Sequence, residues 1–230
     1  AAAFRFLGAE VALTYLNEKA KRFVEPIAEE LEAPIFLPCN VENHGELEAV
    51  FQAAQKQWGK IDFALHSIAF APKDDLLGRL TDSSGPGFAQ AMDISCHSFV
   101  RMAKLAEPLM PDGGALFAMS YYGAEKVVPH YNLMGPVKAA LECCVRYLAY
   151  ELGPKGIRVH AISPGPIRTR AASGLNEFDT LLSHAETRAP ANQLVTIKDV
   201  GIATAALATP GGHLITGNTI YIDGGYHIMG

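Results

Sequence analysis

Short apolar runs alternate with helical stretches along almost the whole chain, and this alternation restricts the fold more than any other feature. The runs expected to be strands are Ala9–Tyr15, Pro34–Cys39, Ile61–Ile68, Gly113–Met119, Ile157–Ile162 and Thr219–Ile222. The stretches expected to be helices are Ala1–Leu7, Lys19–Leu31, Glu42–Trp58, Phe88–Leu109, Asn132–Leu152 and Ile197–Ala208. Such strand–helix–strand units predict an α/β fold, a doubly wound parallel sheet of the Rossmann type in one domain spanning 1–230.

The first strand of such a sheet and the glycine-rich turn after it are not found in the sequence. A doubly wound dinucleotide fold begins with that strand and turn, which holds the pyrophosphate. Here a helix tail ended by Gly8 comes first. The missing strand is central in the usual order, so its loss would leave unpaired edges inside the sheet. We expect an N-terminally incomplete chain; an inactive fragment is less favoured, because every other element is kept.

Composition and charge exclude several classes of protein. Of the 230 residues 49% are apolar and 19% charged, and the net charge of −5 argues against a nucleic-acid surface. No apolar run reaches the roughly 18 residues of a membrane span, and no secretory signal is visible. The cysteines Cys39, Cys96, Cys143 and Cys144 lack C-x2-C spacing and are predicted to be buried thiols in a reducing compartment. We expect a cytoplasmic protein without membrane, nucleic-acid or metal partners.

The stretch from Ser120 to Lys138 carries the candidate chemistry. It holds Tyr121 and Tyr131, with Lys138 seven positions after the second tyrosine. If a helix starts near Tyr131, seven residues make close to two turns at roughly 3.6 residues per turn. The phenol and the ammonium would then project from one helix face near the carboxyl end of the preceding strand, where ligands bind in open α/β sheets.

A tyrosine beside a lysine is suited to stabilising negative charge on a substrate oxygen. Tyrosine has a pKa near 10 in water, and a nearby ammonium favours the phenolate and makes the phenol a better proton donor. Hydride addition to a carbonyl, or to a double bond conjugated with one, creates charge on such an oxygen. The spacing by itself also arises by chance, so it counts only in its structural context.

This segment resembles the active-site region of the short-chain dehydrogenase/reductase superfamily, and more closely that of the NADH-dependent enoyl-[acyl-carrier-protein] reductases of the FabI type. Ordinary members of the superfamily have a catalytic serine where this chain has Ala118, whereas two tyrosines followed by a lysine mark the enoyl reductases. Further stretches that agree in order are His66–Pro72, Asp93–Ser95, Ser98–Val100, Ile162–Thr169, Ala171–Gly174 and Ile222–Gly225. The likeness runs nearly end to end.

The resemblance implies roles for the tyrosines and the lysine. Tyr131 would hydrogen-bond the thioester carbonyl oxygen together with the cofactor ribose hydroxyl, and Lys138 would bind the nicotinamide ribose. Tyr121 would lie beside the substrate and help to position or polarise the enoyl group; the alternative is a packed aromatic residue. The implied reaction is the reduction of a trans-2-enoyl thioester of fatty acid biosynthesis by NADH.

The resemblance also implies a cofactor site. Its expected residues are Asn40, Val41, Ser67, Ile68, Ala69, Lys138, Gly165, Ile167, Arg168, Thr169, Arg170 and Ala171. The family usually has aspartate at the place of Asn40, whose amide oxygen can also accept from the adenine. Leu16-Asn17-Glu18 after the strand ending at Tyr15 lacks the basic residue that a 2′-phosphate requires there. NADH is therefore expected, and NADPH is less favoured.

The acyl pocket is expected to be apolar, because an acyl chain has no polar group beyond its thioester. Positions that match pocket residues of the family are Phe70, Ala71, Leu76, Tyr121, Met134, Pro166, Ala172 and Phe178. By the same resemblance, Thr169–Arg188 would be a mobile lid. Binding of the acyl-carrier protein requires a basic patch near the mouth of the pocket, for which Lys73, Arg168 and Arg170 are the candidates. Gly217–Met229 resembles a subunit-contact region, which implies a homotetramer.

Two other functions remain open. One is a ketone or alcohol dehydrogenase of the same superfamily, against which Ala118 and Tyr121 argue. The other is a catalytically silent nucleotide-binding scaffold, since a fold does not dictate function. A silent protein is expected to have lost Tyr131 or Lys138, and this chain keeps both.

Overall fold

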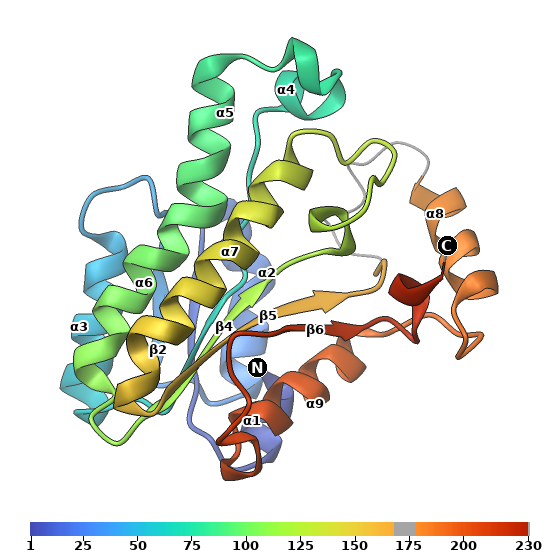
Figure 1. The fold of residues 1–230 in the computed structure, drawn as a ribbon. Helices are drawn as coiled ribbons and strands as arrows, with labels where there is room; N and C mark the ends of the chain where they lie inside the picture. The colour runs from blue at the N-terminus through green and yellow to red at the C-terminus, as the bar shows by residue number, and fades with distance from the viewer. Residues whose placement is uncertain (168–177, 230) are drawn as a thin grey trace.

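Parallel strands run through the centre of the computed structural model, which describes residues 1–167 and 178–229 (Figure 1). The strands of this described part are β1 (Ala12–Tyr15), β2 (Ile35–Pro38), β3 (Phe63–His66), β4 (Gly114–Met119), β5 (Ile157–Pro164) and β6 (Thr219–Ile222). β1 pairs with β2, and β3, β4, β5 and β6 pair in that order, all in parallel. The predicted α/β fold with a parallel sheet is confirmed.

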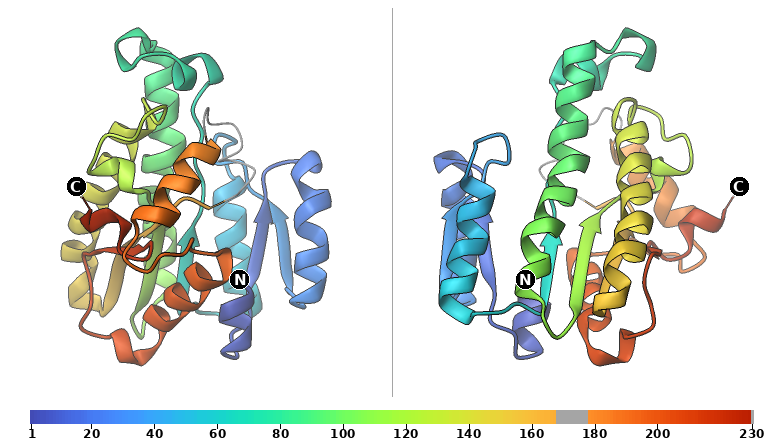
Figure 2. Two further views of the ribbon diagram at one scale, coloured as in Figure 1. Left: turned by 90° about the vertical axis from the view of Figure 1, so that its right-hand side faces the viewer. Right: turned by 60° about the vertical axis from the view of Figure 1, so that its left-hand side comes forward.

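Helices pack on both faces of these strands (Figure 2). Their bounds are α1 (Ala2–Phe6), α2 (Glu18–Glu30), α3 (Glu46–Trp58), α4 (Lys73–Leu77), α5 (Gly85–Met92), α6 (Ser98–Ala106), α7 (Met134–Leu152), α8 (Phe178–Arg188) and α9 (Ile197–Ala208). α6 packs between α3 and α7 on one face, whereas α1 and α9 pack together on the other. The doubly wound arrangement of the Rossmann type follows from these two layers.

Strand β4 shows how the sequence builds both layers. Its side chains alternate between the faces of the sheet, as the two-residue period of a strand requires. Leu116 and Ala118 are buried in the core with α6 and α7, whereas Ala115 and Phe117 are buried in the second core with α1 and α9. β4 is therefore covered on both sides, which explains its continuous apolar sequence.

The two groups of strands are separated by a cavity of about 680 Å³. Residues of β1 and β3 both line it, and its lining continues to Cys39, Ser67 and Ile68 at the carboxyl ends of the strands.

Several boundaries differ from those expected. The single helix predicted for Phe88–Leu109 is divided into α5, a π-helical turn (Asp93–His97), α6 and a 3₁₀ turn (Glu107–Leu109), and α4 was not predicted. Helix α7 begins at Met134 rather than Asn132, because His130 and Asn132 have positive φ angles of 65° and 36°. Such angles lie outside the right-handed helical region. Tyr131 is therefore in a turn before the helix.

Candidate active site

Lys138 reaches from the second turn of α7 to the carboxyl end of β4. Its side chain is buried, with 4% of the residue exposed, and its Nζ donates a hydrogen bond of 2.6 Å to the carbonyl oxygen of Met119, the last residue of β4. The next residue, Ser120, continues the pairing by donating its N–H to Ile162 of β5 at 2.7 Å. The ammonium thus lies at the sheet edge where an open α/β fold binds its ligands.

Tyr131 and Tyr121 lie together next to this edge. Their ring centroids are 4.9 Å apart in an edge-to-face arrangement, an attractive geometry for aromatic pairs. The half-buried Tyr131 ring covers Gly123, where a Cβ atom would lie 2.4 Å from the Tyr131 Cδ1 atom. Tyr131 and Lys138 do not project from one helix face as expected, because Tyr131 precedes α7.

Burial controls the protonation of these groups. It raises the pKa of Tyr131 well above the ordinary value, with smaller contributions from Tyr121 and Glu142, and it raises the pKa of Tyr121 as well. The pKa of Tyr131 is therefore raised rather than lowered, and the prediction that Lys138 makes this phenol more acidic is not confirmed. Burial also lowers the pKa of Lys138 to about 8, partly opposed by Cys96 and Glu142. Both phenols are neutral hydrogen-bond donors at pH 7.

The hydroxyl of Tyr121 is a candidate for binding a ligand. It is buried and has no hydrogen-bond partner within residues 1–167 and 178–229. Leaving a buried hydroxyl unpaired costs about 1–3 kcal/mol, so such a group calls for an explanation. A polar ligand beside the Tyr121–Tyr131 pair would satisfy it.

Glu142 is an electrostatic neighbour that the sequence analysis missed. It follows Lys138 by four residues on α7, and its Oε1 accepts a hydrogen bond of 2.5 Å from the hydroxyl of Ser120. Its charge raises the pKa of both Tyr131 and Lys138. The spacing of four residues, which places two side chains on one helix face, was the available signal.

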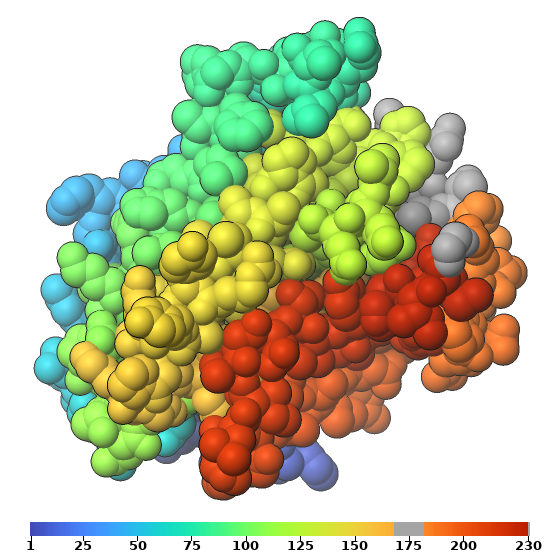
Figure 3. Space-filling model, viewed as in Figure 1, coloured from blue at the N-terminus to red at the C-terminus, as the bar shows by residue number. Residues whose placement is uncertain are grey.

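The loop around Glu125 is attached to the C-terminal segment. The hydroxyl of Tyr221 in β6 donates a hydrogen bond of 2.5 Å to Glu125 Oε2, and the rings of Tyr122 and Tyr226 pack at 5.7 Å. Figure 3 shows this loop in yellow-green against the red C-terminal segment. A pocket of about 370 Å³ lies beside it, and Glu125, Glu142 and Arg146 are among its lining residues.

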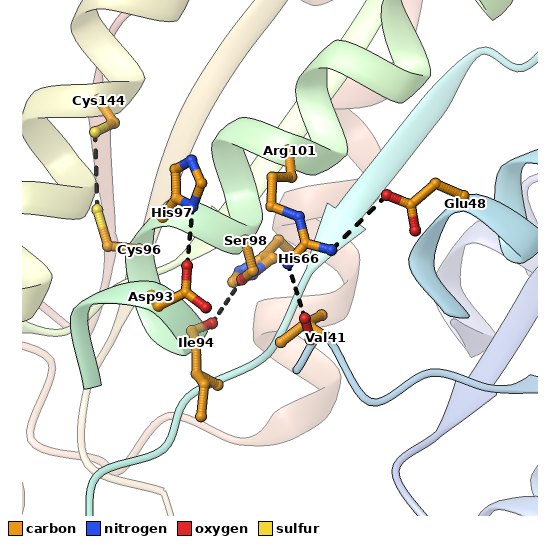
Figure 4. Close-up of polar contacts among 10 residues, drawn as sticks. All are labelled: Val41, Glu48, His66, Asp93, Ile94, Cys96, His97, Ser98, Arg101 and Cys144. Carbon is orange, nitrogen blue, oxygen red and sulfur yellow. Dashed lines mark hydrogen bonds and ion pairs between the residues drawn. The ribbon is translucent and has the colours of Figure 1, made fainter. Parts of the chain in front are cut away.

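The expected adenine side of the cofactor site follows β2. Asn40 is half-buried, and its Oδ1 accepts a hydrogen bond of 3.1 Å from the N–H of Glu42, which leaves one lone pair for a ligand. Val41 is buried, and its carbonyl accepts a hydrogen bond of 2.8 Å from Arg101 Nη1 (Figure 4). The backbone at Val41 is thus fixed to α6.

The expected ribose segment follows β3 directly. Ser67 and Ala69 are exposed and Ile68 is half-buried, so the segment presents open surface just beyond the strand. Before it, His66 is buried with its Nε2 atom 2.6 Å from the Ser98 hydroxyl (Figure 4). Burial and the charge of Lys138 lower the pKa of His66 to about 3, so its imidazole is neutral at pH 7.

The expected nicotinamide segment begins after β5. Gly165 and Pro166 are buried, and the Gly165 N–H donates a hydrogen bond of 2.9 Å to Ile222 of β6. Ile167 is half-buried and packs against the core on the α9 face. Arg168, Thr169, Arg170 and Ala171 lie outside the described residues, as do Ala172 of the expected pocket and residues 169–177 of the expected lid.

The expected substrate residues differ in exposure. Phe70 is 46% exposed, Ala71 and Leu76 are half-buried, and Met134 is buried in the core. The carbonyl of Leu76 in α4 accepts a hydrogen bond of 2.9 Å from Asn132, which connects α4 to the turn of Tyr131. Phe178 begins α8, but its side chain is not among the described groups. Their contact with an acyl chain remains a prediction.

The four cysteines agree with the predicted buried thiols only in part. All four cysteines are free; Cys39 and Cys96 are buried as expected, whereas Cys143 and Cys144 are only half-buried. The Cys96 and Cys144 sulfur atoms are 3.7 Å apart (Figure 4).

Within the described ranges no group of His, Cys, Asp or Glu is arranged for a metal, and no helix is long and apolar enough to cross a membrane. Lys73 is exposed at the start of α4.

The fold and the site together define a class of protein. A doubly wound parallel sheet with a tyrosine pair and a buried lysine beyond its central strand β4 is the arrangement of a nicotinamide-dependent oxidoreductase of the short-chain dehydrogenase/reductase type.

Comparison with known proteins identifies the family within this class. The family described as "Enoyl-(Acyl carrier protein) reductase" matches residues 1–227. The chain belongs to this family. It is 48% identical over 223 residues to "Enoyl-[acyl-carrier-protein] reductase [NADH] 1" of Rhizobium meliloti, a match that covers 97% of this chain and 82% of the relative. It is 45% identical over 222 residues to the corresponding FabI protein of Escherichia coli, with 96% and 85% covered.

Solved structures agree with this assignment. The Anaplasma phagocytophilum reductase, crystallised in complex with NAD, superposes with a TM-score of 0.92 at 45% identity, over 99% of this chain and 85% of that chain. The Aquifex aeolicus enoyl-[acyl-carrier-protein] reductase (NADH) superposes with a TM-score of 0.95 at 41% identity, over 100% and 90%.

Proposed function

We propose that this protein reduces the trans-2 double bond of enoyl-[acyl-carrier-protein] thioesters in fatty acid biosynthesis, with NADH as the reductant. Membership of the enoyl reductase family and the NADH specificity in the names of its relatives support the reaction and the cofactor. The observation that carries the proposal is that a neutral tyrosine pair and the buried Lys138 both lie at the end of β4. NADH supplies a hydride when bound; the protein supplies placement and stabilisation of charge.

Tyr131 would stabilise the charge that develops on the thioester carbonyl oxygen. Addition of hydride at the β-carbon moves electrons onto this oxygen and gives an enolate, which is then protonated at the α-carbon. A neutral phenol can donate a hydrogen bond to the enolate oxygen, and the raised pKa of Tyr131 keeps its proton in place. Tyr131 therefore acts as a hydrogen-bond donor throughout.

Lys138 would hold the nicotinamide ribose. Its Nζ has three donors, of which one is used by the Met119 carbonyl, so two remain for ribose hydroxyls. Its burial at the end of β4 fixes where these donors point. The residues present thus fit a nicotinamide nucleotide at this edge.

The other predicted positions keep their proposed roles. Tyr121 would direct its unpaired hydroxyl toward the thioester. Asn40, Val41 and the segment Ser67–Ala69 would contact the adenosine, and the segment 165–171 the nicotinamide. The proposed acyl pocket comprises Phe70, Ala71, Leu76, Met134, Pro166, Ala172 and Phe178. For the carrier protein we propose Lys73, Arg168 and Arg170; Asp74 and Asp75, which directly follow Lys73, reduce the local positive charge.

A homotetramer and a cytoplasmic location also belong to this proposal. The resemblance of Gly217–Met229 to a subunit-contact region supports the tetramer, and four free thiols suit a reducing compartment. Sedimentation of the purified protein tests the assembly.

The decisive experiment compares two thioesters. Purified protein is mixed with NADH and either crotonyl-CoA, an enoyl thioester, or acetoacetyl-CoA, a ketone. Oxidation of NADH with crotonyl-CoA is expected. Consumption with the ketone alone would assign a ketone reductase instead, and binding of NADH without turnover of either compound would assign a nucleotide-binding scaffold.

A further inference from the structure

A π-helical turn interrupts the long helix that packs against α7. The turn, Asp93–His97, lies between α5 and α6, and π-helical turns inside helices are frequent at functional sites. It carries Ser95, and Ser98 follows in the first turn of α6. Both serines are completely buried. The reaction proposed above assigns no role to either residue.

Ser95 binds both backbone groups of one loop residue. Its Oγ accepts a hydrogen bond of 2.8 Å from the N–H of Phe70 and donates one of 2.9 Å to the carbonyl oxygen of Phe70. Phe70 follows β3 by four residues, where the parallel ladder with β4 no longer supplies partners. A hydroxyl can donate and accept a hydrogen bond at the same time, so it can satisfy both backbone groups of Phe70 in place of a neighbouring strand.

Ser98 holds the other end of the same loop. Its hydroxyl donates to the Ile94 carbonyl at 2.6 Å, so it accepts from His66 Nε2, also at 2.6 Å (Figure 4). A serine has a single hydroxyl proton, which fixes this direction. His66 is additionally held in the β-ladder opposite Ala118.

The two serines therefore fix both ends of the segment Ser67–Ala69. Three residues lie between His66 and Phe70, and the two serines that hold them are three residues apart, in the π-helical turn and at the start of α6. We propose that Ser95 is a positioning residue that sets the backbone of Ser67–Ala69 for binding of the NADH ribose. The proposal rests on the cofactor role assigned to this segment above.

A positioning role and a merely structural role predict different kinetics. Loss of the Ser95 hydroxyl frees the exposed segment Ser67–Ala69 at one end, so contacts with the cofactor weaken equally in the ground state and the transition state. Such a change raises KM and leaves kcat nearly constant. A structural role would lower the melting temperature without changing either constant.

The test uses Ser95→Ala, with Thr204→Ala as the matched control. Thr204 is also buried, and its hydroxyl donates one hydrogen bond, to the Val200 carbonyl at 2.7 Å, but it lies in α9. The Kd for NADH, measured by its fluorescence, and the KM for NADH with crotonyl-CoA are expected to rise about tenfold in Ser95→Ala, which loses two buried hydrogen bonds to Phe70. The control is expected to match the wild type within twofold in both.

Equal Kd values for Ser95→Ala and Thr204→Ala would overturn the positioning role. If Ser95→Ala does not fold, Ser95→Cys serves instead; its weakly hydrogen-bonding thiol is expected to raise Kd about threefold, and an unchanged Kd would overturn the proposal. The fluorescence measurement needs no turnover. A wild-type protein that binds NADH without reducing crotonyl-CoA would thus refute the proposed reaction while leaving the effect of Ser95 measurable.

Discussion

The position of the Tyr131 ring depends on the absence of a side chain at residue 123. A Cβ atom built on Gly123 would lie 2.4 Å from Tyr131 Cδ1 and 2.9 Å from Cε1, whereas ordinary contacts begin near 3.4 Å. In Gly123→Ala the ring must therefore retreat by about 1 Å, the difference between 3.4 and 2.4 Å. The φ angle of Gly123 is not positive, so the backbone itself tolerates alanine.

A shift of this size is expected to separate activity from stability. Misplacement of a catalytic group by 1 Å costs up to about 10²-fold in rate. Overpacking costs about 1–3 kcal/mol of unfolding free energy, which a folded domain can tolerate. We expect kcat with crotonyl-CoA to fall about 10²-fold in Gly123→Ala while the Kd for NADH changes less than threefold. Stopped-flow turnover and NADH fluorescence measure the two quantities.

Gly153→Ala is the control for this prediction. Gly153 lies directly after α7, and a Cβ atom there would meet no heavy atom within 4 Å. Its turnover is expected to equal that of the wild type. A Gly123→Ala protein that turns over within twofold of the wild type would refute the reasoning, because the ring position would then not determine catalysis.

Three further predictions concern titration and burial. Because the pKa of Lys138 is lowered to about 8, kcat/KM for NADH should fall about tenfold per pH unit above pH 8. In Lys138→Arg this decline of kcat/KM should begin only above pH 10. A flat profile in the wild type would contradict the role of the ammonium. Tyr121→Phe removes a buried hydroxyl without a partner among the described residues, so the free energy of unfolding should rise by about 1 kcal/mol while turnover falls. A fall in both the free energy of unfolding and turnover would show that the hydroxyl is paired. The folded state keeps His66 neutral and lowers its pKa from 6.5 to about 3, so the unfolded state takes up a proton first as the pH falls. The folded protein is therefore most stable with respect to His66 above pH 6.5 and loses stability below it. Relative to His66→Gln, urea titrations should show a loss of about 1.4 kcal/mol per pH unit between pH 6 and 3; parallel curves would contradict the neutral imidazole.

The sequence predicts elements best where local signals and tertiary packing agree. Helix α9 begins and ends where expected, because Thr196 and Asp199 form a capping box at its start. The start of α7 was placed two residues early, because His130 and Asn132 adopt positive φ angles in the turn before the helix. The π-helical turn was not predicted either, because its extra residue is stabilised by distant partners such as Phe70.

The site was predicted by residue type better than by electrostatics. The tyrosine pair and Lys138 lie at the end of β4, as the predicted order of strand and helix required. The pKa of Tyr131 could not be predicted, because its direction depends on how deeply the ring is buried and on Glu142, which becomes a neighbour only after folding. Ser95 carries no motif signal of its own, since its function in the fold is a contact with backbone atoms from a different element.

In the proposed reaction Tyr131 binds the thioester oxygen and Lys138 binds the cofactor. The most direct measurement is the Kd for NADH and the kcat with crotonyl-CoA for Tyr131→Phe and Lys138→Ala in the same preparation series. Tyr131→Phe is expected to keep the Kd of the wild type and to lose turnover, whereas Lys138→Ala is expected to lose NADH binding itself. Small and equal effects of both substitutions would contradict the account.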